Sequence, residues 1–310
     1  MHYEIRNILV PTDFSETANN ALRVAVAMAH RHNAGLQLLH IIQPPMYIDP
    51  AGMHGTFAGI EQTLLSDANN NLQKHKAAIQ KSSGLLVTTH TEIGTIAHCI
   101  SNYVLDNQKD LVVMGTHGTS GWSEFFLGSN AMSTIKQCSC PVLTIPPTFT
   151  KTTFDSVLYP IRNVEGVLEK YDYIKPIIQR NDAKVHLLGV AYINDEYETS
   201  TLSNKLRAVR EVILHNNEYI SYETHQCHNI AEKVLEVAHT RADDIMIINA
   251  TLDKNWYKFF SGSYTQQIVN HAKIPVLSVK PALTPDSEQQ REKFLAAEAS
   301  HYSPLSILPN

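Results

Sequence analysis

The chain has 310 residues, of which 43% are hydrophobic and 18% are charged, and its formal net charge is −5. This length predicts about two domains of roughly 150 residues each, and the composition is typical of a globular protein. Neither half is basic, with 8 Lys/Arg against 10 Asp/Glu in residues 1–150 and 17 against 20 in residues 151–310. Nucleic acid and anionic membranes are therefore not the expected partners. The start lacks a signal-peptide pattern and no apolar run approaches the roughly 18 residues of a membrane helix, so a cytoplasmic location is expected.

Strand and helix patterns alternate along the first half of the chain. Ser15 precedes apolar residues at spacing i, i+3, i+4, i+7, which predicts a capped helix. Further helices are expected at Glu61–Lys81, Thr95–Leu105 and Ser129–Gln137, and strands at Ile5–Val10, Leu36–Ile42, Leu85–Thr91, Leu111–Met114 and Val142–Ile145. This alternation favours a parallel sheet with helices on both faces, in which ligands bind beyond the carboxyl ends of the strands.

A glycine-rich loop follows the strand that ends at Met114. Four glycines lie in the fifteen residues GTHGTSGWSEFFLGS, from 115 to 129, although the whole chain has only 13. Glycines between a strand and a helix let an anion approach backbone N–H groups, and the helix dipole favours negative charge there. The spacing Gly115-x2-Gly118-x9-Gly128-Ser129 is neither a Walker A motif nor a dinucleotide fingerprint. It predicts a loop that holds phosphate groups.

The pattern of strands occurs twice. Ile8–Pro11 matches Val157–Pro160 at an offset of 149 residues (157 − 8), and Pro141–Leu143 matches Pro275–Leu277 at an offset of 134 (275 − 141). The second copy is therefore 15 residues shorter (149 − 134), and the Pro- and Gly-rich segment 43–59 is what it lacks. We predict domains at residues 1–147 and 155–281, followed by a partly helical tail at 282–310.

The opening ILVPTDFSE, the glycine loop and the closing CSCPVLTIP together resemble the universal stress protein family. The resemblance extends to about Pro281 as a tandem of two such domains. It implies an α/β fold of two doubly wound domains of the adenine-nucleotide alpha-hydrolase-like type, each with a five-stranded parallel sheet and helices on both faces. It also implies that ATP binds the first domain, with Mg²⁺ as a candidate companion of the phosphates.

The resemblance assigns roles by matching position. In the ATP-binding branch of the family, the aspartate after the first strand contacts the nucleoside, a hydrophobic residue at the end of the second strand lines the adenine pocket, and the glycine loop holds the phosphates. The residues so assigned are Asp13, Ile41, Gly115, Gly118, Gly128 and Ser129, and the predicted site also includes the residues that flank them, Pro11, Thr12, Met114 and Asn130. Asp13 and Ser129 have alternatives as turn or helix-cap residues, and His40 and His117 are more typical of structural or solvated histidines. No catalytic residue is assigned, and no metal ligand, because the close pair Cys138 and Cys140 lacks further ligands at a suitable spacing.

The second copy carries different side chains at these positions. Arg162 replaces the aspartate and cannot accept a hydrogen bond from a ribose hydroxyl. Asn249 and Leu252 replace the first two loop glycines, so side chains stand where phosphates would approach the backbone. Gly262-Ser263 remain and, with Arg162, leave a smaller anion as an alternative ligand. We expect the second copy not to bind ATP in the family manner.

The last strands of the two copies are candidates for pairing. Val142–Ile145 and Val276–Val279 are short apolar strands that would otherwise be sheet edges, unless the linker Pro146–Phe154 covers one of them. The resemblance implies that they pair the two domains within the chain, and a homodimer of the whole chain is also expected. The functional expectation is nucleotide-dependent signalling in a stress response. A slow ATP hydrolase or self-phosphorylating protein and a nucleotide-free dimeric scaffold are the alternatives.

Overall fold

The computed structural model describes residues 3–44, 58–116, 129–216, 219–250 and 263–280. Every element predicted for the first half is present, and α4 and β5 begin and end at the predicted residues. The first half comprises β1 Asn7–Pro11, α1 Glu16–His32, β2 Gly35–Ile42, α2 Ala58–Ser83, β3 Val87–Ile93, α3 Ile96–Asp106, β4 Leu111–Gly115, α4 Ser129–Gln137 and β5 Val142–Ile145. The second half comprises β6 Ser156–Ile161, α5 Lys170–Asn181, β7 Lys184–Tyr192, α6 Glu196–His215, β8 Ile220–Cys227, α7 Ile230–Arg241, β9 Ile245–Asn249, α8 Tyr264–His271 and β10 Val276–Val279.

Local sequence signals explain how α1 begins and ends. The Ser15 hydroxyl accepts a hydrogen bond from the Ala18 backbone N–H at 3.2 Å, which confirms the predicted cap. Asn33 ends the helix in the left-handed conformation, at φ 53°. One stripe of the helix is fully buried against the sheet and contains Ala21, Val24, Ala25, Met28 and Ala29.

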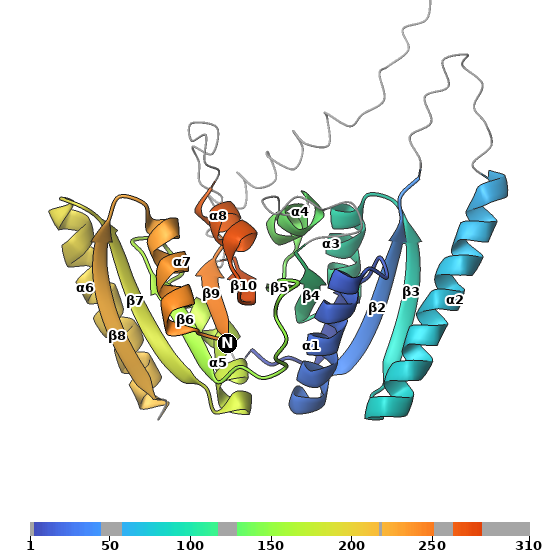
Figure 1. The fold of residues 1–310 in the computed structure, drawn as a ribbon, viewed down its shortest axis with the longest axis horizontal. Coiled ribbons are helices and arrows are strands. Elements are labelled where there is room, and N and C mark those ends of the chain that lie inside the picture. The colour runs from blue at the N-terminus through green and yellow to red at the C-terminus, as the bar shows by residue number, and fades with distance from the viewer. Residues whose placement is uncertain (1–2, 45–57, 117–128, 217–218, 251–262, 281–310) are drawn as a thin grey trace, which may run out of the picture.

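The strands described form one ten-stranded sheet in the order β3-β2-β1-β4-β5-β10-β9-β6-β7-β8 (Figure 1). Within each half the neighbouring strands are parallel, as expected for a doubly wound fold. β5 and β10 are antiparallel, with Thr144 opposite Val276 and Val142 opposite Ser278. The predicted pairing of the last strands within the chain is therefore confirmed, and it joins the two halves at the centre of the sheet.

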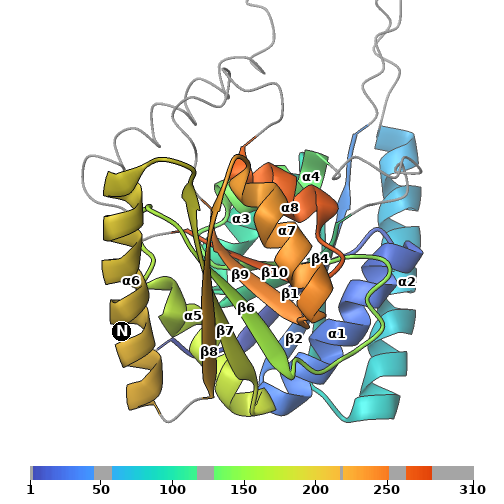
Figure 2. The ribbon, with the colours of Figure 1, turned by 60° about the vertical axis from the view of Figure 1, so that its left-hand side comes forward.

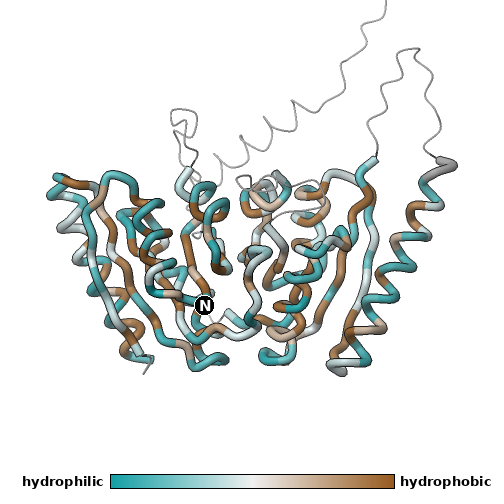
Figure 3. The backbone as a smooth tube through the Cα atoms, viewed as in Figure 1, coloured by the Kyte–Doolittle hydropathy of each residue, from teal (hydrophilic) through white to brown (hydrophobic). Residues whose placement is uncertain are grey.

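Helices cover both faces of this sheet (Figures 1 and 2). The buried core on one face receives side chains from α1, α2, α5 and α6, and the core on the other face receives them from α3, α4, α7 and α8. Successive strand residues alternate between the two cores: Ile8 and Val10 point to one and Leu9 to the other. The central strands are accordingly apolar along most of their length, and the hydropathy colouring of Figure 3 shows hydrophobic residues along them, whereas the edge strands β3 and β8 are more polar.

The repeat is visible in individual contacts. Asp110 accepts a hydrogen bond from the Asn7 backbone N–H at 2.8 Å, at the start of the first strand. Asp244, which matches Asp110 at the offset of 134 (244 − 110), accepts one from the Asp155 N–H at 2.8 Å, just before β6. Asp244 also forms an ion pair with Lys151 of the linker, at 2.5 Å. A carboxylate at the same point thus anchors the first strand of each half.

The linker between β5 and β6 lies against α1. The Asn20 side-chain amide donates hydrogen bonds to the carbonyls of Pro146, at 3.1 Å, and Phe149, at 3.0 Å. Arg31 donates to the Thr152 carbonyl at 2.9 Å. Most of segment 43–59 and the whole of 282–310 lie outside the described residues, so the domain limits stay a prediction. Among the helices described, none is long and apolar enough to span a membrane.

Candidate functional site

The strand order reverses once in each half, between β1 and β4 and between β6 and β9. We call the carboxyl ends of these strand pairs the first and the second switch point. β1 and β4 are direct neighbours, with Leu9 opposite Val112. In doubly wound sheets, ligands bind at such a point because the chain leaves the two strands toward opposite faces. Pro11 ends β1 and Gly115 ends β4, so the predicted site residues flank the first switch point.

The turn from β1 to α1 is held by its own polar groups. Thr12 is buried, and its backbone N–H donates to the Leu39 carbonyl at 2.9 Å. The exposed Asp13 accepts a hydrogen bond through Oδ1 from the Ser15 N–H at 3.0 Å. The turn role that was the alternative for Asp13 is thus observed, and it fixes the carboxylate at the first switch point.

An aromatic stack supports this turn, and no local sequence pattern predicts it. Phe14 has φ 63°, a left-handed conformation that is unusual for a bulky residue. Its ring stacks on His40 at a centroid distance of 4.7 Å and on His75 of α2 at 5.5 Å. His40 Nδ1 also donates to the Thr12 carbonyl at 2.8 Å. His40 therefore has a structural role beside the site, as the more typical interpretation of a lone strand-end histidine predicted.

The end of β4 supplies the other wall of the first switch point. Gly115 is half-buried and lies opposite Ile145 of β5. Ile41, which the resemblance assigns to the adenine pocket, is half-buried on the same face of the sheet as the buried Met114, which flanks the assigned residues. The two side chains belong to one hydrophobic cluster. The structure thus brings together residues that lie more than 70 positions apart in the sequence.

The amino end of α4 is the third part of the predicted site, after the β1–α1 turn and the end of β4. Ser129 and Asn130 are exposed in the first turn of the helix, where the leading backbone N–H groups have no partner within the helix. The Asn130 carbonyl accepts a hydrogen bond from the Thr134 hydroxyl at 2.7 Å. Gly118 and Gly128 lie outside the described residues, so the loop that would join β4 to α4 around a phosphate stays a prediction.

The second switch point is filled by side chains. Asn249, buried at the position of Gly115, donates from Nδ2 to the Gly166 carbonyl at 2.7 Å. Arg162, at the position of Asp13, places its guanidinium 3.5 Å from the ring centroid of Tyr264. Tyr264 in turn matches Asn130 at the offset of 134 (264 − 130). Side chains at the second switch point thus contact one another and the backbone.

Burial and nearby charge at the second switch point shift the pKa values of two further side chains. Lys170 is 2% exposed at the position of Ala21 (170 − 149), and its ammonium group donates to the Pro160 carbonyl. Burial lowers the pKa of Lys170 well below its ordinary value, and the nearby charge of Arg162 lowers it further. Burial also raises the pKa of Tyr264 to about 12, against the opposing charge of Arg162. These groups are packed into the fold rather than presented to solvent.

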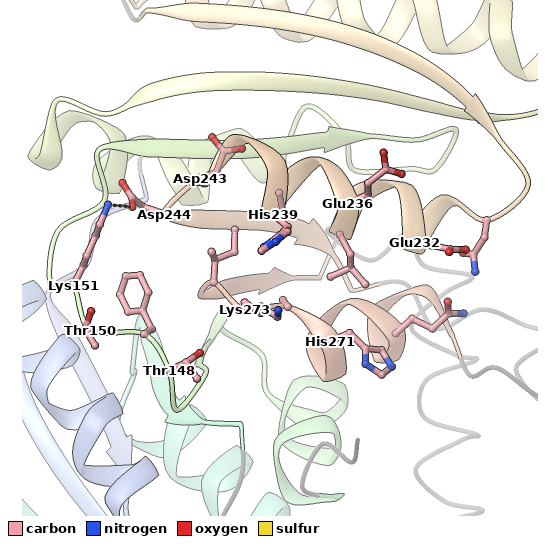
Figure 4. A pocket seen from close by; sticks show the side chains of 18 residues that line it. Thr148, Thr150, Lys151, Glu232, Glu236, His239, Asp243, Asp244, His271 and Lys273 are labelled. Carbon is pink, nitrogen blue, oxygen red and sulfur yellow. Dashed lines mark hydrogen bonds and ion pairs between the residues drawn. The ribbon is translucent and has the colours of Figure 1, made fainter. Parts of the chain in front are cut away.

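A groove of about 1000 Å³ lies elsewhere, between the linker, α7 and the carboxyl end of α8 (Figure 4). The ion pair between Lys151 and Asp244 closes one end, and His239 and Lys273 line it. It belongs to neither switch point. In the part of the chain that the structure describes, no group of three or more His, Cys, Asp or Glu side chains is placed to hold a metal ion.

Known proteins resemble this chain both in sequence and in fold. A family model described as the universal stress protein family matches residues 4–146. A universal stress protein of Methanocaldococcus jannaschii is 29% identical over 143 residues, which cover 45% of this chain and 81% of that protein. The first half of the chain, over residues 4–146, belongs to the universal stress protein family.

Two longer matches cover both halves. A universal stress protein of Synechocystis sp. is 21% identical over 294 residues, which span 89% of this chain and 100% of that protein. The crystal structure of a universal stress protein from Archaeoglobus fulgidus superimposes with a TM-score of 0.72 at 15% identity, and covers 90% of this chain and 100% of that one. The likeness in fold therefore extends over both halves, each of which is doubly wound.

Proposed function

We propose that the first switch point binds ATP and that the protein acts as a nucleotide-dependent regulatory module in a cytoplasmic stress response. The observation that carries this proposal is the meeting of three components at one edge of the sheet. Asp13 supplies an acceptor for ribose hydroxyl groups, and the apolar pair Ile41 and Met114 suits an adenine ring. Gly115 and the amino end of α4 suit the phosphates.

The contrast with the second half supports a single nucleotide site per chain. Asn249 and the stacked pair Arg162 and Tyr264 occupy the positions of three of the proposed contacts. Mg²⁺ would accompany the phosphate charge, and Asp13 is the carboxylate of the β1–α1 turn. A homodimer of the whole chain is part of the same proposal, because family domains pair and this chain already contains one such pair.

Copying one second-half residue into the first half tests the proposal. In Gly115→Asn, an amide side chain enters the space proposed for phosphate, as Asn249 does in the second half. We expect ATP binding about 100-fold weaker than in the wild type, equivalent to roughly 2.7 kcal/mol. The matched control is Gly84→Asn: Gly84 has φ +70°, which Asn tolerates, and an added Cβ meets nothing within 4 Å.

Calorimetric titration with MgATP reads the result directly. Strong binding by the wild type and by Gly84→Asn, together with loss in Gly115→Asn, supports the site at the first switch point. A wild type that takes up no ATP contradicts the proposal and leaves the nucleotide-free scaffold. Release of ADP during the titration would instead favour the slow hydrolase.

A further inference from the structure

Helix α4 connects the first switch point with the junction between the two halves. Its first residues, Ser129 and Asn130, lie on the site side, and its last, Gln137, precedes β5, which pairs with β10. Ala131 and Ile135 are buried and attach the helix to the sheet along its side. A helix of only nine residues is not stable by itself, so the contacts at its two ends add to this side packing in holding it.

The carboxyl end of α4 is capped by an ammonium group from the second half. Lys280 Nζ donates a hydrogen bond to the Cys138 carbonyl at 2.6 Å and another to the Lys136 carbonyl. From α3, the Ser101 hydroxyl donates to the Gln137 carbonyl at 3.1 Å. Hydrogen bonds from a charged donor are stronger than neutral ones, and a cation at this end of a helix also interacts favourably with the helix dipole.

The register of the central strand pair places Lys280 at this point. Because β5 and β10 are antiparallel with Val142 opposite Ser278, the end of β10 lies beside the start of β5. The start of β5 is also where the chain arrives from α4. Lys280 directly follows Val279, the last residue of β10, and is half-buried. The cap is therefore a product of the pairing of the two halves.

The matching position in the other half differs. At the offset of 134, Lys280 corresponds to Pro146 (280 − 134), which follows β5. A proline ring carries no hydrogen-bond donor, so this position does not provide α8 with an equivalent cap. The helix that receives the ammonium group is the one whose amino end follows the glycine loop with the phosphate-binding pattern.

We propose that Lys280 is a positioning residue for the nucleotide site and acts through α4. This inference rests on the proposed function. An ammonium group at one end of α4 and phosphates at the other stabilise the same helix, so each favours the binding of the other. Coupling of this kind is reciprocal. Bound nucleotide therefore tightens the contact between α4 and the end of β10, and the nucleotide state of the first half is transmitted to the second.

The variant Lys280→Met tests the coupling, because it removes the charge and keeps most of the side-chain stem. We expect the Kd for MgATP to rise about fivefold, and Lys280→Arg, which restores a cationic donor, to recover most of the affinity. Lys273→Met is the control. It removes an exposed lysine shortly before the same strand, at the opposite end of β10 from Lys280, and should leave the Kd unchanged.

Amide hydrogen exchange provides a readout that a merely structural lysine would not change. In the wild type, MgATP should slow exchange at Gln137 and Cys138, at the far end of α4 from the phosphates. In Lys280→Met that slowing should be absent at saturating MgATP.

A Kd for Lys280→Met within twofold of the wild type overturns the coupling, even where the melting temperature of the unliganded protein falls. An equal loss of affinity in Lys273→Met also overturns it, because the effect would then be one of overall charge. A wild type that binds no MgATP contradicts both the coupling and the proposed function, whereas binding that is indifferent to Lys280 contradicts the coupling alone.

Discussion

The two halves of the chain share a strand order but differ at their switch points. In the first, a glycine ends β4 and exposed polar residues open α4. In the second, Asn249 forms hydrogen bonds with the backbone before α5, and Arg162 stacks on Tyr264. A doubled fold can therefore keep its sheet and its anchoring carboxylates, Asp110 and Asp244, while the side chains at its two switch points differ.

Physical chemistry explains why the filled switch point is stable without a ligand. Each satisfied hydrogen bond contributes about 1 kcal/mol, and a cation over an aromatic ring contributes about 0.5–2 kcal/mol. The two hydrogen bonds that Asn249 donates, to Glu165 and Gly166, and the stacking of Arg162 on Tyr264 supply such contacts permanently. The first half has none of these side chains at the matching positions. We expect a nucleotide to supply the corresponding contacts there.

After Gly115→Asn, we expect the largest loss of MgATP affinity from a change of charge in the β1–α1 turn. Asp13→Arg copies Arg162, removes the acceptor for ribose hydroxyl groups and places a long side chain at the first switch point. We expect MgATP to bind about 50-fold more weakly, since losing a charged hydrogen-bond acceptor and filling the site cost roughly 2.3 kcal/mol. Titration of Asp13→Arg beside Asp106→Arg, the same charge change at an exposed position at the end of α3, measures the effect.

Asp13→Asn separates the hydrogen bond that Asp13 makes within the turn from its proposed contact with the nucleotide. The amide oxygen can still accept from the Ser15 N–H, so the turn is retained while the charge is lost. We expect an affinity between those of the wild type and Asp13→Arg. Full affinity in Asp13→Arg would show that this position makes no contact with the nucleotide.

A second contrast lies at the ends of α1 and α5, where His32 matches Asn181 (181 − 149 = 32). Asn181 donates to the Ile177 carbonyl at 2.7 Å, whereas His32 Nε2 is buried without a hydrogen-bond partner among the described residues. Burial, together with the nearby charges of Arg180 and Arg31, lowers the pKa of His32 to about 4. At pH values between about 4 and 6.5 the unfolded chain therefore binds a proton that the folded chain does not.

The stability of the wild type should consequently fall as pH drops from about 6.5 toward 4, and His32→Asn, which cannot titrate, should lose this component. We expect the difference in the free energy of unfolding between the two proteins to change by about 2 kcal/mol across this window, after allowance for the partial exposure of the ring. Urea unfolding at about pH 7 and pH 4.5 measures it. A difference that stays constant with pH would show that His32 titrates normally in the folded protein.

Much of the fold follows from the sequence, because the periodic patterns and the repeat constrain each other. The cap at Ser15, the limits of α4 and the pairing of Val142–Ile145 with Val276–Val279 are all confirmed. The placement of Asp13 and Gly115 at one edge was equally predictable, since parallel strands end on the same side.

Other features depend on three-dimensional contacts that no local pattern encodes. The left-handed Phe14 is held by rings from β2 and α2, which lie 26 or more positions away. The buried Lys170 has an ordinary helical sequence around it, and only the position of Ala21 in the other half marks it as unusual. The contact of Lys280 with α4 requires the antiparallel register of β5 and β10 as well as their pairing.

Nucleotide stoichiometry is the most direct test of the difference between the halves. We would measure the number of ATP molecules bound per chain at saturation by equilibrium dialysis, on the wild type and on Gly115→Asn. We predict one per wild-type chain and none per chain in the variant at concentrations that saturate the wild type. Two per chain, or an unchanged value of one in Gly115→Asn, would contradict the assignment of a single site to the first switch point.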